Sequence, residues 1–520
     1  MGAELPTVTS GEPLLSYIRR HLDAGGRLPP DGIDLPDEVV LANTAIRWAP
    51  GALEGVFGHH GGNDDVERTV RDVADLLVKV CRRPTRRRLR SLHEALVEAH
   101  ALSIVDRLID ELARRQAGND AVRRIGLWLA STSPNTGPVK IGLALLGATG
   151  LEGCVDVVRT LGAHDEFTLY AATAMRNGLK ESDSELWALA VSVDGWGRIH
   201  CVERLSNTED PQIRAWLLRE GYKNSIMYEY TAFIAAETGG LLAALECDPV
   251  DRVLLTAAGE ILSALIEGGP AEDIGDYAAG ADAIERYLTL MRSRAESLDD
   301  YLAVAAIRDF VGEGEHEAFD RPGWTVSRRE AFHATSLEIL GEPSWHDRVG
   351  VLLGPDASDD DIWKRRSVAR DLGIDTFEVT FGRIEQHPLG SDWYDAWRDA
   401  DTDRAHRLVE LARTRLPLEE VASGSSNALG IGPGYEAHQA LDWSLQALGS
   451  YPGIGGDLLV FGLQSPVTRN RNMALSALHK WPAASWPPEA RALVEAADAA
   501  DPNEDTRELA GRVLRGESAD

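Results

Sequence analysis

Residues 195–230, GWGRIHCVERLSNTEDPQIRAWLLREGYKNSIMYEY, hold the densest set of side chains that could do chemistry. His200 and Glu203 are three residues apart, so on a helix they lie close enough to interact. Such a pair can transfer protons when it is shielded from water. It can equally be an ordinary pair on the surface of a helix. An enzyme hypothesis therefore rests on His200 and Glu203, with Arg198 or Arg214 holding an anionic group.

The same stretch is rich in tryptophan, tyrosine and arginine, the residue types that are enriched at protein-binding surfaces. These residues also fill the seams between packed helices, where a tyrosine hydroxyl finds a polar partner. Both interpretations are open at this point. The predicted partner-binding residues of the stretch are Trp196, Arg198, Arg214, Arg219, Tyr222, Asn224, Tyr228 and Tyr230.

A second polar run, RNRN at 469–472, stands at a predicted helix start. Arg469 and Arg471, flanking an amide, could clamp a carboxylate or a phosphate. Alternatively, the run caps neighbouring turns and pairs with acidic residues. Both arginines are added to the predicted partner-binding residues.

A basic run, CRRPTRRRLR at 81–90, is a third candidate. It could mark a contact with an anion. It also fits the solvated first turns of a helix entered at Thr85, and in that case an acidic neighbour is expected, because basic side chains there oppose the helix dipole. The arginines of the run are Arg82, Arg83, Arg86, Arg87, Arg88 and Arg90.

Signatures of metal or cofactor binding are missing from the sequence. The 14 histidines are spread out, with no HExxH motif. The four cysteines form no CxxC pair and resemble no disulfide framework. The Gly-rich segment 422–434 matches neither the dinucleotide fingerprint nor the phosphate-loop pattern, so it is interpreted as a flexible loop. The sequence predicts no cofactor and no metal site.

The elements that must position these residues are predicted to be helices. Apolar residues recur at three- and four-residue spacing almost everywhere, and strand patterns are scarce. In VDRVLLTAAGEILSALIEG at 250–268, one apolar stripe runs from Leu254 to Leu265 and the helix ends in glycine. Asp210 followed by Pro211 is a typical helix start. The predicted fold class is all-α.

YAATAMRN (170–177), NMALSALHK (472–480) and ELAGRVLRG (508–516) share small residues at a spacing that lets two helices pack closely. They resemble the second helix of HEAT repeats over roughly 130–515, although no strict period of about 40 residues can be traced. The resemblance implies an armadillo-like α-solenoid of stacked helical hairpins. The predicted organisation is an N-terminal helical cap (1–130), HEAT-like repeats (131–320), and further HEAT-like repeats with the Gly-rich insert 422–434 (321–520).

The net charge of −30 argues against nucleic acid as the main partner and favours a basic one. The N-terminus lacks the basic start and apolar run of a signal peptide. No apolar run approaches the roughly 20 residues that cross a bilayer. With only six lysines among the basic residues, the composition fits a bacterial genome of high GC content. A cytoplasmic location with no membrane span is expected.

Three segments resemble a widespread set of bacterial helical proteins, some of which carry the label limonene hydroxylase: GWGRIH…WLLREGYKN…IMYEY, HQALDWSLQAL (438–448) and SPVTRNRNMALSAL (465–478). The label implies a monoterpene hydroxylase, but the sequence holds none of the cofactor-binding motifs that an oxygenase needs. The favoured prediction is a non-enzymatic scaffold that binds a protein partner along a groove lined by 196–230, with self-association as a further possibility. The alternative is an enzyme using His200 and Glu203.

Overall fold

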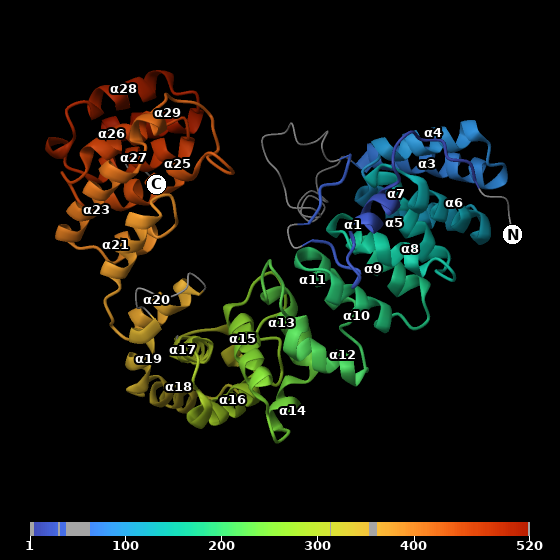
Figure 1. Ribbon diagram of the computed structural model, residues 1–520, viewed down its shortest axis with the longest axis horizontal. Coiled ribbons are helices and arrows are strands. Elements are labelled where there is room, and N and C mark those ends of the chain that lie inside the picture. The colour runs from blue at the N-terminus through green and yellow to red at the C-terminus, as the bar shows by residue number, and fades with distance from the viewer. Residues whose placement is uncertain (1–4, 30–31, 38–62, 313, 353–360, 518–520) are drawn as a thin grey trace. The chain divides into compact units, whose positions relative to one another are not determined.

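The computed structural model describes residues 5–29, 32–37, 63–312, 314–352 and 361–517 (Figure 1). Within these residues every regular element is a helix, so the predicted all-α class is confirmed. Pairing of extended backbone is limited, in the same residues, to an isolated parallel bridge between Ala428 and Val467.

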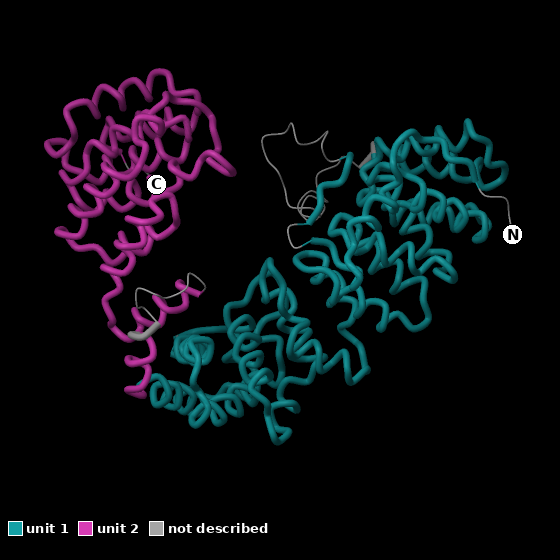
Figure 2. Tube along the Cα trace, viewed as in Figure 1, with its two compact units in different colours: residues 1–341 teal, residues 342–520 magenta. Residues whose placement is uncertain are grey.

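The chain forms two compact units, residues 1–341 and 342–520 (Figure 2). The predicted borders at 130/131 and 320/321 both fall inside the first unit. One hydrophobic cluster spans the first border, because it includes Leu129 and Ala130 as well as Val139. At the second border, the helices 298–312 and 326–340 pack against each other.

The described residues of the first unit contain seventeen α-helices and two short turns of other helix types. They are α1 (Leu14–His21), α3 (Asn63–Arg82), α4 (Arg86–Glu98), α5 (Ala101–Arg114), α6 (Asn119–Thr132), α7 (Thr136–Thr149), α8 (Val155–Gly162), α9 (Asp165–Gly178), α10 (Asp183–Ser192), α11 (Gly195–Glu203), α12 (Pro211–Trp216), the π-helical turn η2 (Leu217–Gly221), α13 (Glu229–Gly239), α14 (Leu241–Glu246), α15 (Arg252–Glu267), α16 (Gly280–Arg294), α17 (Leu298–Gly312), the 3-10 turn η3 (Glu317–Asp320) and α18 (Val326–Leu340), with α19 (Ser344–Leu352) opening the second unit.

Alternate helices of the first unit form a continuous row. Each of α3, α5, α7, α9, α11, α13, α15 and α17 packs against the next member of that series. The second helices of the hairpins also contact each other in places. The contacting pairs are α8 with α10, α14 with α16, and α16 with α18. Each hairpin therefore buries its apolar face against the hairpins before and after it.

Small residues allow a close approach within this row, between α7 and α9, and also between α8 and α9. A Cβ on Gly147 of α7 would lie 2.6 Å from the Cα of Ala174 on α9. A Cβ on Gly162 would lie 2.6 Å from the Cβ of Ala171. Both alanines belong to the YAATAMRN segment, whose small residues had been expected to face a neighbouring helix closely.

Several local predictions are confirmed in the first unit. Asp210 caps α12, because its Oδ1 accepts hydrogen bonds from the backbone N–H groups of Gln212 and Ile213, and Pro211 is the first helical residue. In α15 the stripe from Leu254 to Leu265 is buried, and the helix ends at Gly268 with φ +67°. These starts and stops come from local chemistry, which explains why the sequence reveals them.

The second unit is built from α20 (Ile362–Asp371), α21 (Phe377–Gln386), α22 (Trp393–Arg398), α23 (Thr402–Arg415), α24 (Leu418–Val421), α25 (Glu436–Leu448), α26 (Gly456–Leu463), α27 (Thr468–Lys480), the 3-10 turn η4 (Ala483–Ser485), α28 (Ala490–Ala500) and α29 (Glu504–Arg515), together with α19. Two rows of alternate helices recur here: α25, α27 and α29 in one, α24, α26 and α28 in the other. Their core is a hydrophobic cluster that runs from Phe377 to Val513.

Candidate functional site

The stretch 195–230 folds as α11, α12, η2 and the loop that leads into α13. Ile199, Val202 and Leu205 point inward from α11 and its last turn and are buried, as their spacing predicts. Gly221 ends the second helix after a π-helical turn. Most of this stretch is therefore packed into the core of the helical unit. Whether it can also bind or react depends on where its polar side chains lie.

His200 and Glu203 do lie together on α11, with His200 Nδ1 3.4 Å from Glu203 Oε2. Burial alone would raise the pKa of Glu203. The hydrogen bond and charge of His200, together with Arg204, outweigh burial and leave the pKa below its usual value. The Glu203 side chain is 48% exposed. The Glu203 carboxylate is thus open to water, whereas His200 is half-buried.

Asp165, which the sequence did not single out, lies near this pair at the start of α9. Its Oδ1 is 3.1 Å from the point that a Cβ on Gly197 would occupy, so the glycine admits the carboxyl against α11. Burial raises the pKa of Asp165 to about 6, with the charge of Asp194 adding to the rise and His164 and His200 opposing it. The GWG sequence at 195–197 was the available signal, since a glycine inside a helix marks a close approach.

The three arginines predicted in the stretch are used within the protein. Arg198 donates from Nε to the carbonyls of Ala190 and Val193 at the C-terminal end of α10, and from Nη1 to the carbonyl of Lys223. Such contacts satisfy carbonyls that a helix end leaves open.

Arg214 and Arg219 lie nearer to the surface. Arg214 donates from Nε to the carbonyl of Thr238 at 2.7 Å, and Arg219 pairs with Asp251 at 2.7 Å. Arg219 and Asp251 are both partly exposed, so this ion pair contributes little to stability.

Two of the predicted binding residues are buried. Tyr222 is fully buried, and its hydroxyl donates to the Glu260 carboxylate. Asn224 holds the turn before α13: its amide nitrogen donates to Tyr222, Met227 and Thr231, and its amide oxygen accepts from two backbone N–H groups. Neither side chain leaves surface for a partner.

The remaining aromatic residues of the stretch form contacts at the surface. The ring of Trp196 packs against that of Tyr230, 5.0 Å between centroids, and stacks on His200 at 6.2 Å. Tyr228 meets Tyr222 edge to face at 5.4 Å. Trp196, Tyr228 and Tyr230 are half-buried. Beside them, Ile226 and Met227 are 38% and 42% exposed.

The RNRN run of the second unit divides into inward and outward residues. Arg471 is 1% exposed and forms a two-pronged ion pair with Asp501, at 2.7 and 2.8 Å. Its Nη1 also donates to the carbonyls of Ser465 and Pro466. The prediction that Arg471 contacts a partner is not supported, because the guanidinium is enclosed and its role is structural. Arg469, in contrast, is half-exposed.

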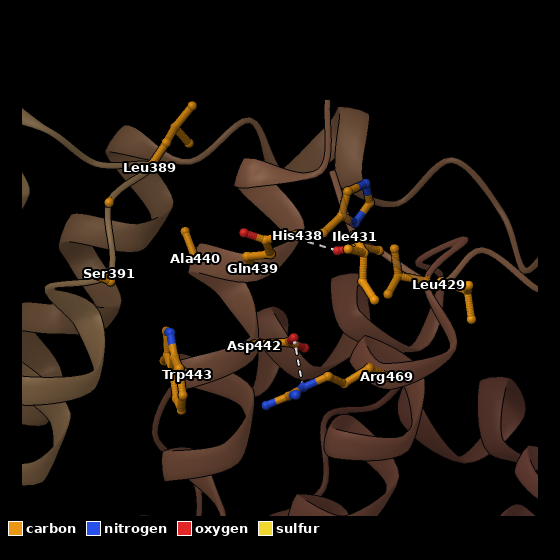
Figure 3. A pocket seen from close by; sticks show the side chains of 13 residues that line it. Leu389, Ser391, Leu429, Ile431, His438, Gln439, Ala440, Asp442, Trp443 and Arg469 are labelled. Atoms are coloured by element: carbon orange, nitrogen blue, oxygen red, sulfur yellow. Dashed lines mark hydrogen bonds and ion pairs between the residues drawn. The ribbon is translucent and has the colours of Figure 1, made fainter. Parts of the chain in front are cut away.

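Arg469 stands in a pocket of about 440 Å³ in the second unit (Figure 3), which we call the α25 pocket. Its walls come from the loop 389–391, from 429–431 in the Gly-rich insert, from α25 between 438 and 443, and from 467–469 at the start of α27. Figure 3 shows Leu429 and Ile431 on one side and Leu389 on the other. A pocket of this volume suits a small ligand or a side chain of a partner.

The polar groups of the pocket are an ion pair and a buried network beside it. Arg469 Nε lies 3.0 Å from Asp442 Oδ2, and Asn470 donates to Asp442 Oδ1. Burial raises the pKa of Asp442, and the opposing effects of Arg469 and Asn470 do not offset it. The guanidinium also lies over the ring of Trp443, 5.9 Å from its centroid. Nη1 and Nη2 of Arg469 make no hydrogen bond to the described residues.

Aliphatic side chains around the α25 pocket are unusually exposed. Leu389 is 46% exposed, Leu429 54% and Ile431 77%. Aliphatic surface gathered around a concave site is typical of binding sites, because a ligand removes it from water. The sequence identified Arg469 here but missed Asp442, Trp443 and the three aliphatic residues.

The insert that carries Leu429 and Ile431 is held by main-chain hydrogen bonds. The N–H of Ala428 donates to Pro466, and the N–H of Thr468 donates to Ala428, both at 3.2 Å. Gly430 has φ +73°, and a Cβ there would lie 2.6 Å from Val467. Only glycine suits that position. The segment expected to be a flexible loop is therefore tied along one side to the start of α27.

In the described residues, no group of three or more histidine, cysteine or acidic side chains is placed to hold a metal ion. Nor does any helix there have the length and apolarity that crossing a membrane requires. No protein-family model matches the chain, and no curated protein is similar to it in sequence. The candidate site is thus defined by its geometry alone.

Proposed function

We propose that this protein is a non-enzymatic binding protein that takes up an apolar residue of a partner protein in the α25 pocket. The observation that carries the proposal is the exposure of Leu389, Leu429 and Ile431 around one concave site with an aromatic wall. Burying one aliphatic side chain there would contribute about 1.5–3 kcal/mol. Anchoring of a partner by a few such residues is the usual source of affinity at protein interfaces.

Arg469 would orient the bound segment. Its Nη1 and Nη2 are free to donate to main-chain carbonyls of the partner, while Asp442 holds the guanidinium in place. We propose that the anchor residue is flanked by basic residues, because the net charge of −30 attracts a cationic partner and repels an anionic one.

The proposal includes a HEAT-like solenoid architecture, with the rows of alternate helices as its support: each helix packs on the second one after it, as in stacked hairpins. It also includes the cytoplasmic location expected from the sequence. Cys81, Cys154, Cys201 and Cys247 are unpaired, which fits a reducing compartment.

The test is selection of peptides from a random display library on the immobilised full chain. A pocket variant, Leu429→Asp with Ile431→Asp, serves as the comparison, because both side chains are exposed and the fold does not depend on them. The matched control is Val326→Asp with Leu337→Asp on α18, whose side chains are 61% and 49% exposed in the first unit.

We expect selected peptides to contain an apolar residue beside Lys or Arg, and to bind wild type and control equally. The pocket variant should bind them at least about ten-fold more weakly, the loss expected for about 1.4 kcal/mol. Selection of no peptide by the wild type, or equal binding to the pocket variant, would refute the proposal.

A further inference from the structure

The run from Lys79 to Arg90 has a charge opposite to that of the whole chain. It holds Lys79 and the six arginines of the basic run, and no acidic residue, in a protein of net charge −30. The structure places this run at the junction between α3, which ends at Arg82, and α4, which begins at Arg86. Thr85 caps α4 by accepting from the N–H of Arg88, so the helix start expected from the sequence is confirmed.

One of these arginines has a structural role. Arg88 donates from Nη1 to the carbonyls of Lys79 and Arg83, both at 3.2 Å, and so satisfies the end of α3. To the described residues, Arg86 makes one long hydrogen bond, 3.4 Å, to the carbonyl of Thr7. The other side chains of the run extend from the surface, where Arg82, Arg83, Arg87 and Arg90 are all exposed.

No acidic side chain of the described residues forms an ion pair with these exposed arginines. The acidic neighbour expected from the sequence is therefore not found among the residues that the structure describes. Arginines elsewhere in the chain are commonly paired: Arg413, for example, makes two contacts with Asp457, at 2.6 and 2.7 Å. The contrast indicates that the anion for this surface is not supplied by the described part of the chain.

A neighbouring helix adds to the same positive surface. Arg124 of α6 is exposed and lies close enough to Cys81 to lower the pKa of that thiol, although burial raises it more. Helices α3 and α6 pack against each other, which brings Arg124 to the end of α3. The basic patch, defined as residues 79–90 together with Arg124, therefore spans three helices.

The arginines of the basic patch lower the stability of the folded chain. Arg86 and Arg90 are like charges four residues apart on one helix, and such pairs are destabilising. Arg86 and Arg87 stand in the first turn of α4, where the helix dipole also repels a cation. A bound anion would remove both penalties. Unfavourable local electrostatics of this kind are typical of functional surfaces, because they do not stabilise the fold.

We propose that the basic patch binds an acidic segment of a partner protein. The inference is independent of the α25 pocket, because it rests on other residues of the other unit. A short acidic segment fits the patch in charge. Acidic side chains flank it along the chain at Asp72 and Asp75 and again at Glu94 and Glu98.

Nucleic acid fits the patch less well. A duplex or a long single strand would extend beyond the patch onto the rest of the protein, which carries a net negative charge. Its phosphates would be repelled there over a Debye length of about 8–10 Å. In addition, residues 79–90 contain no aromatic side chain on which a base could stack. A flexible peptide of Asp and Glu residues can instead stay within the patch.

The experiment measures binding of a fluorescein-labelled dodecapeptide of alternating Asp and Glu to the full chain by anisotropy. The patch variant is Arg83→Glu with Arg87→Glu and Arg90→Glu. The matched control makes the same charge change at exposed residues outside the patch: Arg71→Glu, Lys180→Glu and Arg321→Glu. Circular dichroism and the thermal midpoint verify that each variant is folded. A dodecameric single-stranded DNA is titrated in parallel.

We expect the acidic peptide to bind wild type and to weaken markedly as NaCl rises from about 50 to about 200 mM. The patch variant should lose at least about ten-fold in affinity, and the control variant should lose less than about three-fold. Absence of binding to wild type, or equal losses in the two variants, would overturn the proposal. Tighter binding of the DNA through the same arginines would also overturn it, by assigning the patch to nucleic acid.

Discussion

Replacing Asp165 with asparagine should stabilise the protein at neutral pH. Asp165 Oδ1 lies against Gly197 at the contact between α9 and α11, where burial raises the pKa from 3.8 to about 6. The folded chain therefore holds this proton more tightly than the unfolded chain does. Asparagine has nearly the same shape and carries no charge, so Asp165→Asn removes the cost of ionising a buried carboxyl.

The size and direction follow from the two pKa values. A difference of about 2 units corresponds to about 3 kcal/mol, since one unit is about 1.4 kcal/mol. Because the folded-state pKa is raised, the stability contributed by this group is full below about pH 4 and is lost as the pH rises to about 6. The variant also loses a carboxylate from the first turn of α9, which costs about 0.3–1 kcal/mol. The expected net gain at pH 7 is about 2 kcal/mol.

The assay is urea unfolding of wild type and Asp165→Asn at half-unit steps between about pH 4 and pH 8. The difference in unfolding free energy should be near zero or slightly unfavourable at the acidic end and should grow toward pH 6. Asp120→Asn, an exposed first-turn residue of α6, is the control for the loss of a helix-end carboxylate. A variant that is less stable than wild type by a constant amount from pH 4 to pH 8 would refute the reasoning.

Three further substitutions test other parts of the structure. Arg471→Ala should lower the free energy of unfolding by about 3–5 kcal/mol in a urea titration, because it leaves the Asp501 carboxylate buried and unpaired; an effect below about 1 kcal/mol would contradict this account. Gly147→Ala should destabilise by about 1–3 kcal/mol, because the new Cβ would meet the backbone of Ala174; an unchanged thermal midpoint would show that α7 can move away. Arg87→Glu should raise the thermal midpoint by an amount equivalent to about 1 kcal/mol, because it exchanges a cation for an anion at the start of α4; a fall in the midpoint would indicate an unrecognised acidic partner.

The sequence predicts those features that depend on near neighbours in the chain. The apolar spacing of Ile199, Val202 and Leu205 identifies the inner face of α11. Asp210 before Pro211 identifies a helix start, because the cap and the capped N–H groups are two and three residues apart. The all-α class follows from many such local signals along the chain.

The sequence is less informative about which polar residues are free to bind a partner. Tyr222 and Asn224 have the composition of a binding surface, yet both are buried because the turn before α13 folds them inward. Arg469 and Arg471 are two residues apart and of one type, but only Arg471 finds a buried carboxylate, in Asp501. That distinction depends on the position of a helix 30 residues away in the chain.

The α25 pocket could not be predicted for a related reason. Its walls come from four segments of the chain. Leu389 is 40 residues before Leu429, which is itself 40 residues before Arg469. No spacing rule connects residues so far apart. The alternation of glycine with Leu429 and Ile431 was the local sign, since aliphatic residues in a glycine-rich loop have no helix to pack into.

The way the insert is attached separates the position of the pocket wall from the chemistry of its side chains. Ala428 is fixed to α27 through backbone atoms, which every amino acid except proline supplies. The side chains at 429 and 431 contribute little to that attachment, since both are more than half exposed. Substitutions there can alter the shape and polarity of the pocket wall while its position is kept. On the proposed function, single substitutions at 429 or 431 would change which partner residue the pocket takes up, at little cost in stability.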